Sequence, residues 1–191
     1  MFCPIRDVSA LPKDVFYLFS DKKMSSSELF SELFRQNDLK AEIFYRDGGQ
    51  PYGITKEGEE FPLSATNHKN FSLVCAKERG FLGADLQTAV DWIDPEKQKI
   101  AFTEKEITSC NGDPARFDFL WTAKECLLKS VGIGLGKGYN YVEISTDFAD
   151  NCHFFFKNGE EKLFLRPALF RLPFPKGCCL IFAADCATIK K

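Results

Sequence analysis

Short runs of hydrophobic residues, bounded by turn residues, alternate along this chain with stretches of helical periodicity. The runs predict strands at residues 15–19, 41–46, 71–76, 82–87, 141–146, 153–156, 162–165 and 178–184. The serines at 25–27 can cap a helix whose apolar positions, spaced by three and four, continue to about Gln36. A longer helix is predicted at 117–131, after a shorter one that begins near residue 103. This mixture of elements predicts an α+β fold.

A weak internal repeat bears on the number of lobes. Residues 69–78 and 176–185 both carry an apolar strand between charged residues, and each follows a helix and at least two strands. Two buried strands can resemble each other by chance, so the repeat alone leaves the question open. If it reflects the fold, the chain forms two similar α+β lobes, 1–80 and 81–191, each with a long helix packed on a small antiparallel sheet.

Composition argues against several classes of protein. The 191 residues are 45% hydrophobic and include 20 phenylalanines, which predicts an aromatic core rather than a disordered chain. A net charge of −2 does not favour a nucleic-acid partner, and no apolar run has the length of a membrane span. The eight cysteines are scattered without a Cys-x-x-Cys motif. We therefore expect a reduced, cytoplasmic protein without a signal peptide.

Polar residues in two segments predict a site for a metal ion and phosphate. Asp85 and Gln87 project from the same face of the predicted strand, because side chains alternate along a strand. Glu125 and Lys129 lie one turn apart on the predicted helix, with Lys124 beside them. Hard oxygen ligands beside lysines suit magnesium and phosphate. Taken singly, these residues have simpler interpretations: exposed polar positions on a strand, and an ordinary ion pair on a helix.

Together the two segments resemble the signature of the 4′-phosphopantetheinyl transferases. That family has a Gly-hydrophobic-Asp-hydrophobic-Glu strand, matched here at Gly83 and Asp85, with Gln87 in place of the glutamate. Its Trp-Ser/Thr-x-Lys-Glu-x-x-x-Lys helix follows about forty residues later. This helix motif is matched at Trp121, Thr122, Lys124, Glu125 and Lys129, and Glu125 follows Asp85 by 40 positions.

Two further positions fit the family in part. The family's Gly-Lys-Pro turn corresponds to Gly49-Gln50-Pro51, which lacks the lysine. Its Ser-His pair, in which the histidine lies near a phosphate of coenzyme A, corresponds to Asn67-His68. The resemblance also favours the two-lobed interpretation of the repeat, because the larger single-chain transferases are pseudo-twofold pairs of such lobes with the site between them.

The resemblance implies an enzyme that moves 4′-phosphopantetheine from coenzyme A to a serine of an acyl or peptidyl carrier protein, with Mg²⁺ or alternatively Mn²⁺. Asp85, Gln87 and Glu125 would hold the metal, and Glu125 and Lys129 would be catalytic. Coenzyme A would contact Gln50, His68, Lys124 and Lys129. The carrier would dock on residues 88–106, and the enzyme would act as a monomer.

Two alternatives stay open. The chain is either a transferase or a non-catalytic relative that binds coenzyme A or a carrier protein, which Gln87 and Gln50 would favour. An unrelated α+β structural protein would require the paired motifs to be coincidence. Modification of an apo carrier protein would separate these possibilities.

Overall fold

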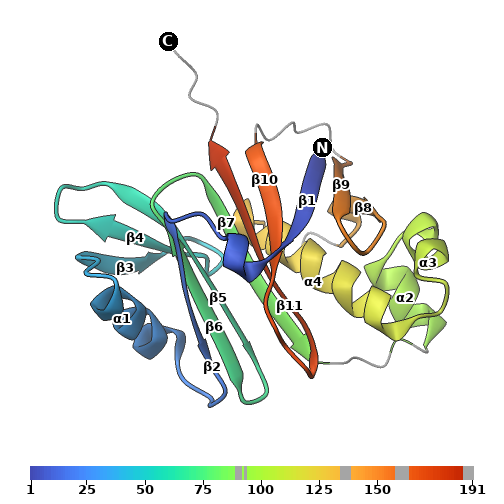
Figure 1. Cartoon of the computed structure of the whole chain (residues 1–191), viewed down its shortest axis with the longest axis horizontal. Coiled ribbons are helices and arrows are strands. Elements are labelled where there is room, and N and C mark those ends of the chain that lie inside the picture. Colours follow the sequence, from blue (N-terminus) through green and yellow to red (C-terminus); the bar gives the residue numbers. More distant parts are fainter. Residues whose placement is uncertain (89–91, 93, 134–138, 158–163, 187–191) are drawn as a thin grey trace, which may run out of the picture.

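The chain folds into two β-sheets and four α-helices within the part that the computed structural model describes, residues 1–88, 92, 94–133, 139–157 and 164–186 (Figure 1). One sheet has five strands in the order β2 (Val15–Ser20), β6 (Phe71–Lys77), β5 (Glu60–His68), β4 (Pro51–Thr55) and β3 (Ala41–Tyr45). The other has six in the order β7 (Phe81–Thr88), β11 (Gly177–Cys186), β10 (Phe164–Arg171), β1 (Phe2–Asp7), β9 (Asn151–Phe156) and β8 (Val142–Thr146). The predicted α+β class is confirmed.

Helix α1 (Ser26–Gln36) covers the outer face of the five-stranded sheet (Figure 1). It begins where predicted, because Ser25 and Glu28 form a reciprocal capping box. Its buried positions, spaced by one, three and four, are Leu29, Phe30, Leu33 and Phe34. They pack on apolar residues of β5 and β6, namely Phe61, Leu63, Val74 and Ala76. This helix is therefore a typical amphipathic helix with one buried face.

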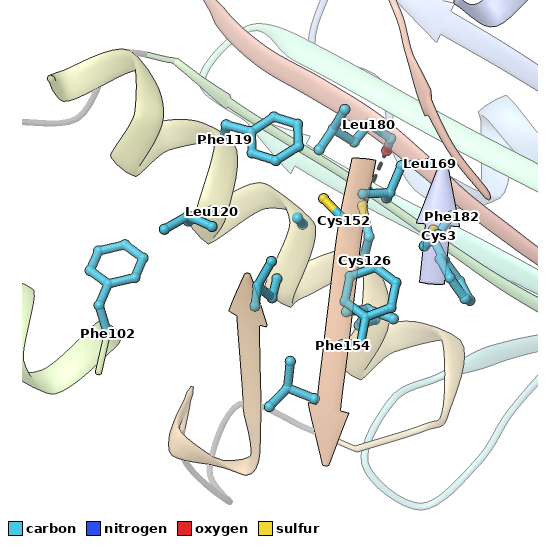
Figure 2. Packing of buried hydrophobic residues seen from close by; sticks show 14 of the residues in the cluster. Cys3, Phe102, Phe119, Leu120, Cys126, Cys152, Phe154, Leu169, Leu180 and Phe182 are labelled. Carbon is cyan, nitrogen blue, oxygen red and sulfur yellow. Dashed lines mark hydrogen bonds between the residues drawn. The ribbon is translucent and has the colours of Figure 1, made fainter. Parts of the chain in front are cut away.

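Helix α4 (Pro114–Ser130) packs on the six-stranded sheet and is buried nearly all round. Asp113 caps it and Pro114 occupies its first turn, so it begins three residues before the predicted start. Figure 2 shows Phe119, Leu120 and Cys126 of α4 packed with residues of the sheet: Cys152, Phe154, Leu180 and Phe182. The short helices α2 (Pro95–Ala101) and α3 (Glu104–Cys110) cover its other side. None of the described helices is long and apolar enough to cross a bilayer.

The two sheets pack against each other through their inner faces. Their shared cluster takes residues from β2 and β6 on one side and from β7, β10 and β11 on the other: Val15, Leu73, Cys75, Leu82, Ala84, Leu86, Ala168, Phe170, Ile181 and Ala183. The buried ammonium of Lys77 on β6 joins the sheets at one end, because it is paired with both Asp14 and Asp185. The layers thus run helix, sheet, sheet, helix.

Several elements differ from the sequence-based expectation. Strand β1 was not predicted, and it pairs in parallel with β10 and antiparallel with β9. Residues 2–7, assigned to the first lobe, therefore lie in the sheet of the second. Strands β4 and β5 were not predicted either, and Pro51 and Pro62 lie within them. Strand β10 extends beyond the predicted 162–165 to Arg171 through a bulge that accommodates Pro167; residues 162 and 163 lie outside the described part.

Candidate active site between strand β7 and helix α4

The site lies where the edge strand β7 passes against helix α4 at very short range. A Cβ at Gly83 would lie 1.8 Å from the carbonyl oxygen of Cys126 and 2.9 Å from the amide nitrogen of Ser130. Only glycine allows this approach of backbone to backbone. The contact brings Asp85, two residues along the strand, to Lys129 on the helix. The glycine of the strand motif therefore sets the distance across the site.

The carboxylate of Asp85 is buried and hydrogen-bonded on both oxygens. Its Oδ1 accepts from Lys129 Nζ at 2.7 Å and from the hydroxyl of Thr66 at 2.9 Å. Among the described residues, its Oδ2 accepts only a longer contact of 3.3 Å from the amide of Gln87. Lys129 Nζ also donates to the carbonyl of Ala84 at 3.2 Å. Burial lowers the pKa of Lys129, but Asp85 and Glu125 outweigh it and raise that pKa above its ordinary value.

Glu125 lacks the partners that Asp85 has. Its side chain is buried, and its Oε1 has no hydrogen-bond partner among the described residues. Burial raises the pKa of Glu125 from 4.5 to about 7, the charge of Asp85 adds to this, and Lys129 opposes it. A buried carboxylate oxygen without a protein donor needs a proton, a cation or a water molecule as its partner.

The residues at this point fit a magnesium ion that is completed by a substrate. Among the described residues, no group of three His, Cys, Asp or Glu side chains is placed to hold a metal ion. The available protein oxygens are the two carboxylates of Asp85 and Glu125 and the amide of Gln87. Magnesium is commonly held by one or two carboxylates together with substrate phosphates. The orphan Oε1 of Glu125 is the feature that best matches this chemistry.

Gln50 and His68 lie at opposite ends of this region. Gln50 Nε2 donates to the carbonyl of Lys129 at 2.9 Å, which ties the turn before β4 to the end of α4. Gln50, Glu125 and Lys129 line a cavity of about 270 Å³. His68 Nε2 is hydrogen-bonded to the hydroxyl of Thr88 at 2.8 Å, at the far end of β7. A larger cavity of about 970 Å³ at the start of α4 has none of these side chains in its lining.

Lys124 is not brought to this cluster. Its side chain is fully buried, and its Nζ donates to Glu106 Oε2 at 2.7 Å and to the carbonyls of Ala101 and Tyr139 at 3.0 and 3.3 Å. Burial lowers the pKa of Lys124 and the charge of Glu106 opposes it. Adjacent helical residues point about 100° apart. Lys124 therefore joins α2, α3 and the turn at Tyr139 instead of facing Asp85.

Trp121 lies among aromatic rings rather than facing the carboxylates. Its ring centre is 4.2 Å from that of Tyr139 and 5.5 Å from that of Trp92. Trp121 is therefore an aromatic anchor packed against the core.

The sequence interpretation missed Thr66, which contacts Asp85 directly. It lies two residues before His68 and shares a face of β5 with it. Strand alternation would have indicated Thr66 had β5 been recognised as a strand.

Residues 81–171 match the family model of the 4′-phosphopantetheinyl transferase superfamily. The match covers β7, α2, α3, α4, β8, β9 and β10, and thus both motifs. This match supports the superfamily that the paired motifs predicted. A comparison with curated proteins found no match.

Proposed function

We propose that this protein transfers 4′-phosphopantetheine from coenzyme A to a serine of an acyl or peptidyl carrier protein, as a magnesium-dependent holo-carrier synthase. The observation that carries the proposal is the unpartnered, buried Oε1 of Glu125 beside the Asp85–Lys129 pair. It lies within the segment that matches the superfamily. A cation and a phosphate would supply the partners that these groups lack.

The reaction exchanges one phosphorus–oxygen bond for another. The serine hydroxyl attacks the phosphorus that bears pantetheine, and the bond to the adenylate phosphate breaks, which releases 3′,5′-adenosine bisphosphate. Magnesium, or manganese in its place, supplies positive charge against the pyrophosphate. Asp85 and Glu125 are its ionic ligands, and Gln87 adds a neutral oxygen once its amide turns from Asp85.

The remaining residues bind coenzyme A and accept the serine proton. Lys129 moves from Asp85 to a phosphate oxygen, because an ammonium can hold either anion. Gln50 and His68 bind coenzyme A from the two ends of the site. Glu125 takes the serine proton, directly or through a water molecule. Lys124 has no part in binding coenzyme A and holds the wall around Tyr139 in place.

The arrangement of the chain supports a complete site in one monomer. The two helix-covered sheets would be the two lobes of a pseudo-twofold pair, and the contact of Thr66 in the first sheet with Asp85 in the second supports a site between them. The carrier protein docks on the segment 88–106, of which residues 89–91 and 93 lie outside the described part.

Mass spectrometry of an apo carrier protein tests the proposal. The carrier should gain the mass of phosphopantetheine after incubation with coenzyme A, magnesium and this protein, and the gain should disappear with a chelator. Glu125→Gln is the matched control, since it keeps the shape of the side chain and removes its charge. Acyl and peptidyl carriers should both be tried.

A second candidate is a binding protein that has lost activity. The amide of Gln87 donates to the oxygen of Asp85 that a metal would use, whereas the family's glutamate could not. Intact coenzyme A binding without any mass gain on several carriers would favour this candidate.

A further inference from the structure

Three side chains of β5 contact the edge strand β7, although the two strands lie in different sheets and are not paired with each other. They are spaced by two residues and share the face turned to the second sheet. Ser64 Oγ accepts the amide of Ala84 at 2.8 Å, Thr66 donates to Asp85, and His68 is bonded to Thr88. Side chains of one sheet thus hold the strand that carries the site in the other.

Thr66 is the member of this row that contacts the carboxylate. Its hydroxyl and the carboxylate of Asp85 are both buried, and they lie 2.9 Å apart. The acceptor is Oδ1, which also accepts from Lys129. Within the part of the chain that the structure describes, Oδ2 receives only the 3.3 Å contact from Gln87. The donors therefore gather on one oxygen and leave the other weakly engaged.

We infer that Thr66 is a positioning residue for the metal site: its hydroxyl fixes Oδ1 of Asp85 so that Oδ2 is presented to the cation. This inference rests on the proposed function, in which Lys129 leaves Asp85 for a phosphate. Thr66 is then the donor that remains on Oδ1. A hydrogen bond to a buried carboxylate restricts its rotation, and a ligand that is fixed beforehand binds a cation more tightly.

Calorimetric titration of Mn²⁺ into the protein with saturating coenzyme A, without a carrier, tests the inference. Thr66→Val keeps the shape and removes the donor, and it should weaken Mn²⁺ binding about tenfold. Thr66→Ser keeps the donor and should stay within about threefold of the wild type. Ser64→Ala is the matched control, because it breaks a neighbouring contact of the same row that does not involve the carboxylate; it should also stay within about threefold.

Three results would overturn the inference. They are unchanged Mn²⁺ affinity in Thr66→Val, equal losses in Thr66→Val and Thr66→Ser, and no Mn²⁺ binding by the wild type with coenzyme A. Thermal unfolding of each variant shows whether it folds; if Thr66→Val does not, Thr66→Ala takes its place.

Carrier modification gives the second measurement. Thr66→Val should raise the magnesium concentration for half-maximal rate more than it lowers the maximal rate, and Thr66→Ser should restore the wild-type value. If the wild type binds Mn²⁺ but modifies no carrier, the proposed function fails while the inference about Thr66 still stands on the titrations.

Discussion

Helix α4 carries two lysines in opposite situations. Lys124 is fully buried and donates to three acceptors, and its partner Glu106 is also saturated by the amides of Thr103 and Ile144 at 2.8 and 2.7 Å. Lys129 keeps 29% of its side chain exposed and is paired with Asp85, next to Glu125, whose Oε1 has no hydrogen-bond partner among the described residues. We call the fully buried Lys124–Glu106 pair the closed pair. The Lys129–Asp85 pair is partly exposed, so a ligand can reach it.

The difference shows that two lysines of one helix motif can differ in how completely their hydrogen bonds are satisfied. A buried pair whose hydrogen bonds are all satisfied is costly to break but has nothing left to bind. A partly exposed pair beside an unpartnered oxygen can exchange partners when a ligand enters. The ammonium of Lys124, beside Glu125 in sequence, is thus held by buried acceptors, whereas Lys129, one turn further along, is the lysine that we propose for phosphate binding.

Breaking the closed pair should have the largest effect. Lys124→Met leaves Glu106 buried without its counter-charge, and the free energy of unfolding should fall by roughly 3–5 kcal/mol. Urea denaturation measures this. Arg116→Met on the same helix, whose side chain is 43% exposed, is the control and should change stability by less than about 1 kcal/mol. A Lys124→Met variant as stable as the wild type would show that the pair does not hold α3 to α4.

Removing the charge of Glu125 should change how stability depends on pH. Because the pKa of Glu125 is raised from 4.5 to about 7, the folded protein holds this proton more tightly than the unfolded chain. The contribution of Glu125 to stability should therefore be full below pH 4.5 and be lost as the pH rises to about 7, by about 3 kcal/mol in total.

Glu125→Gln carries no titrating group and should not show this decline. Unfolding by urea in chelator at pH 5 and pH 8 measures the difference between the two proteins. Parallel pH profiles would mean that Glu125 does not hold a proton at neutral pH in the metal-free protein. The same variant should abolish carrier modification.

Lys129→Ala should weaken coenzyme A binding, about tenfold, because an ammonium contact to phosphate is lost. Calorimetric titration with coenzyme A measures the affinity. The fold should be kept, since Thr66 still donates to Asp85. A fall in thermal midpoint with unchanged affinity would instead make Lys129 structural, like Lys124.

Gln87→Glu should have the smallest effect on the maximal rate, but it should clearly change the affinity for the metal. A glutamate cannot donate to Asp85 and offers a charged carboxylate, so Mg²⁺ should bind more tightly in the absence of coenzyme A. The magnesium concentration for half-maximal carrier modification should fall, with little gain in maximal rate. Identical titrations of both proteins would mean that position 87 does not face the metal.

The sequence predicted the parts of the fold that local patterns define. Helix α1 begins at its capping box, and β7 and α4 were found from apolar patterns and motif residues. The pairing of Lys129 with Asp85 also lies where the paired motifs predicted a site.

Features that depend on residues distant in sequence were missed. The ion pair of Lys124 requires Glu106 of a separate helix. Strand β5 was hidden because the polar face formed by Ser64, Thr66 and His68 turns toward the other sheet rather than to water. Thr66 was therefore not among the expected site residues.

The place of β1 in the six-stranded sheet has a consequence for how the chain folds during synthesis. In the sheet, Cys3 of β1 lies opposite Cys152 of β9, and Ile5 of β1 lies opposite Leu169 of β10. Both neighbouring strands are therefore synthesised long after β1. Such non-local pairings slow folding, because a long loop must close before the contacts form. The second sheet cannot be completed until most of the chain has left the ribosome. The β7–α4 contact that builds the site should therefore become stable only after strands β9 and β10 have been synthesised.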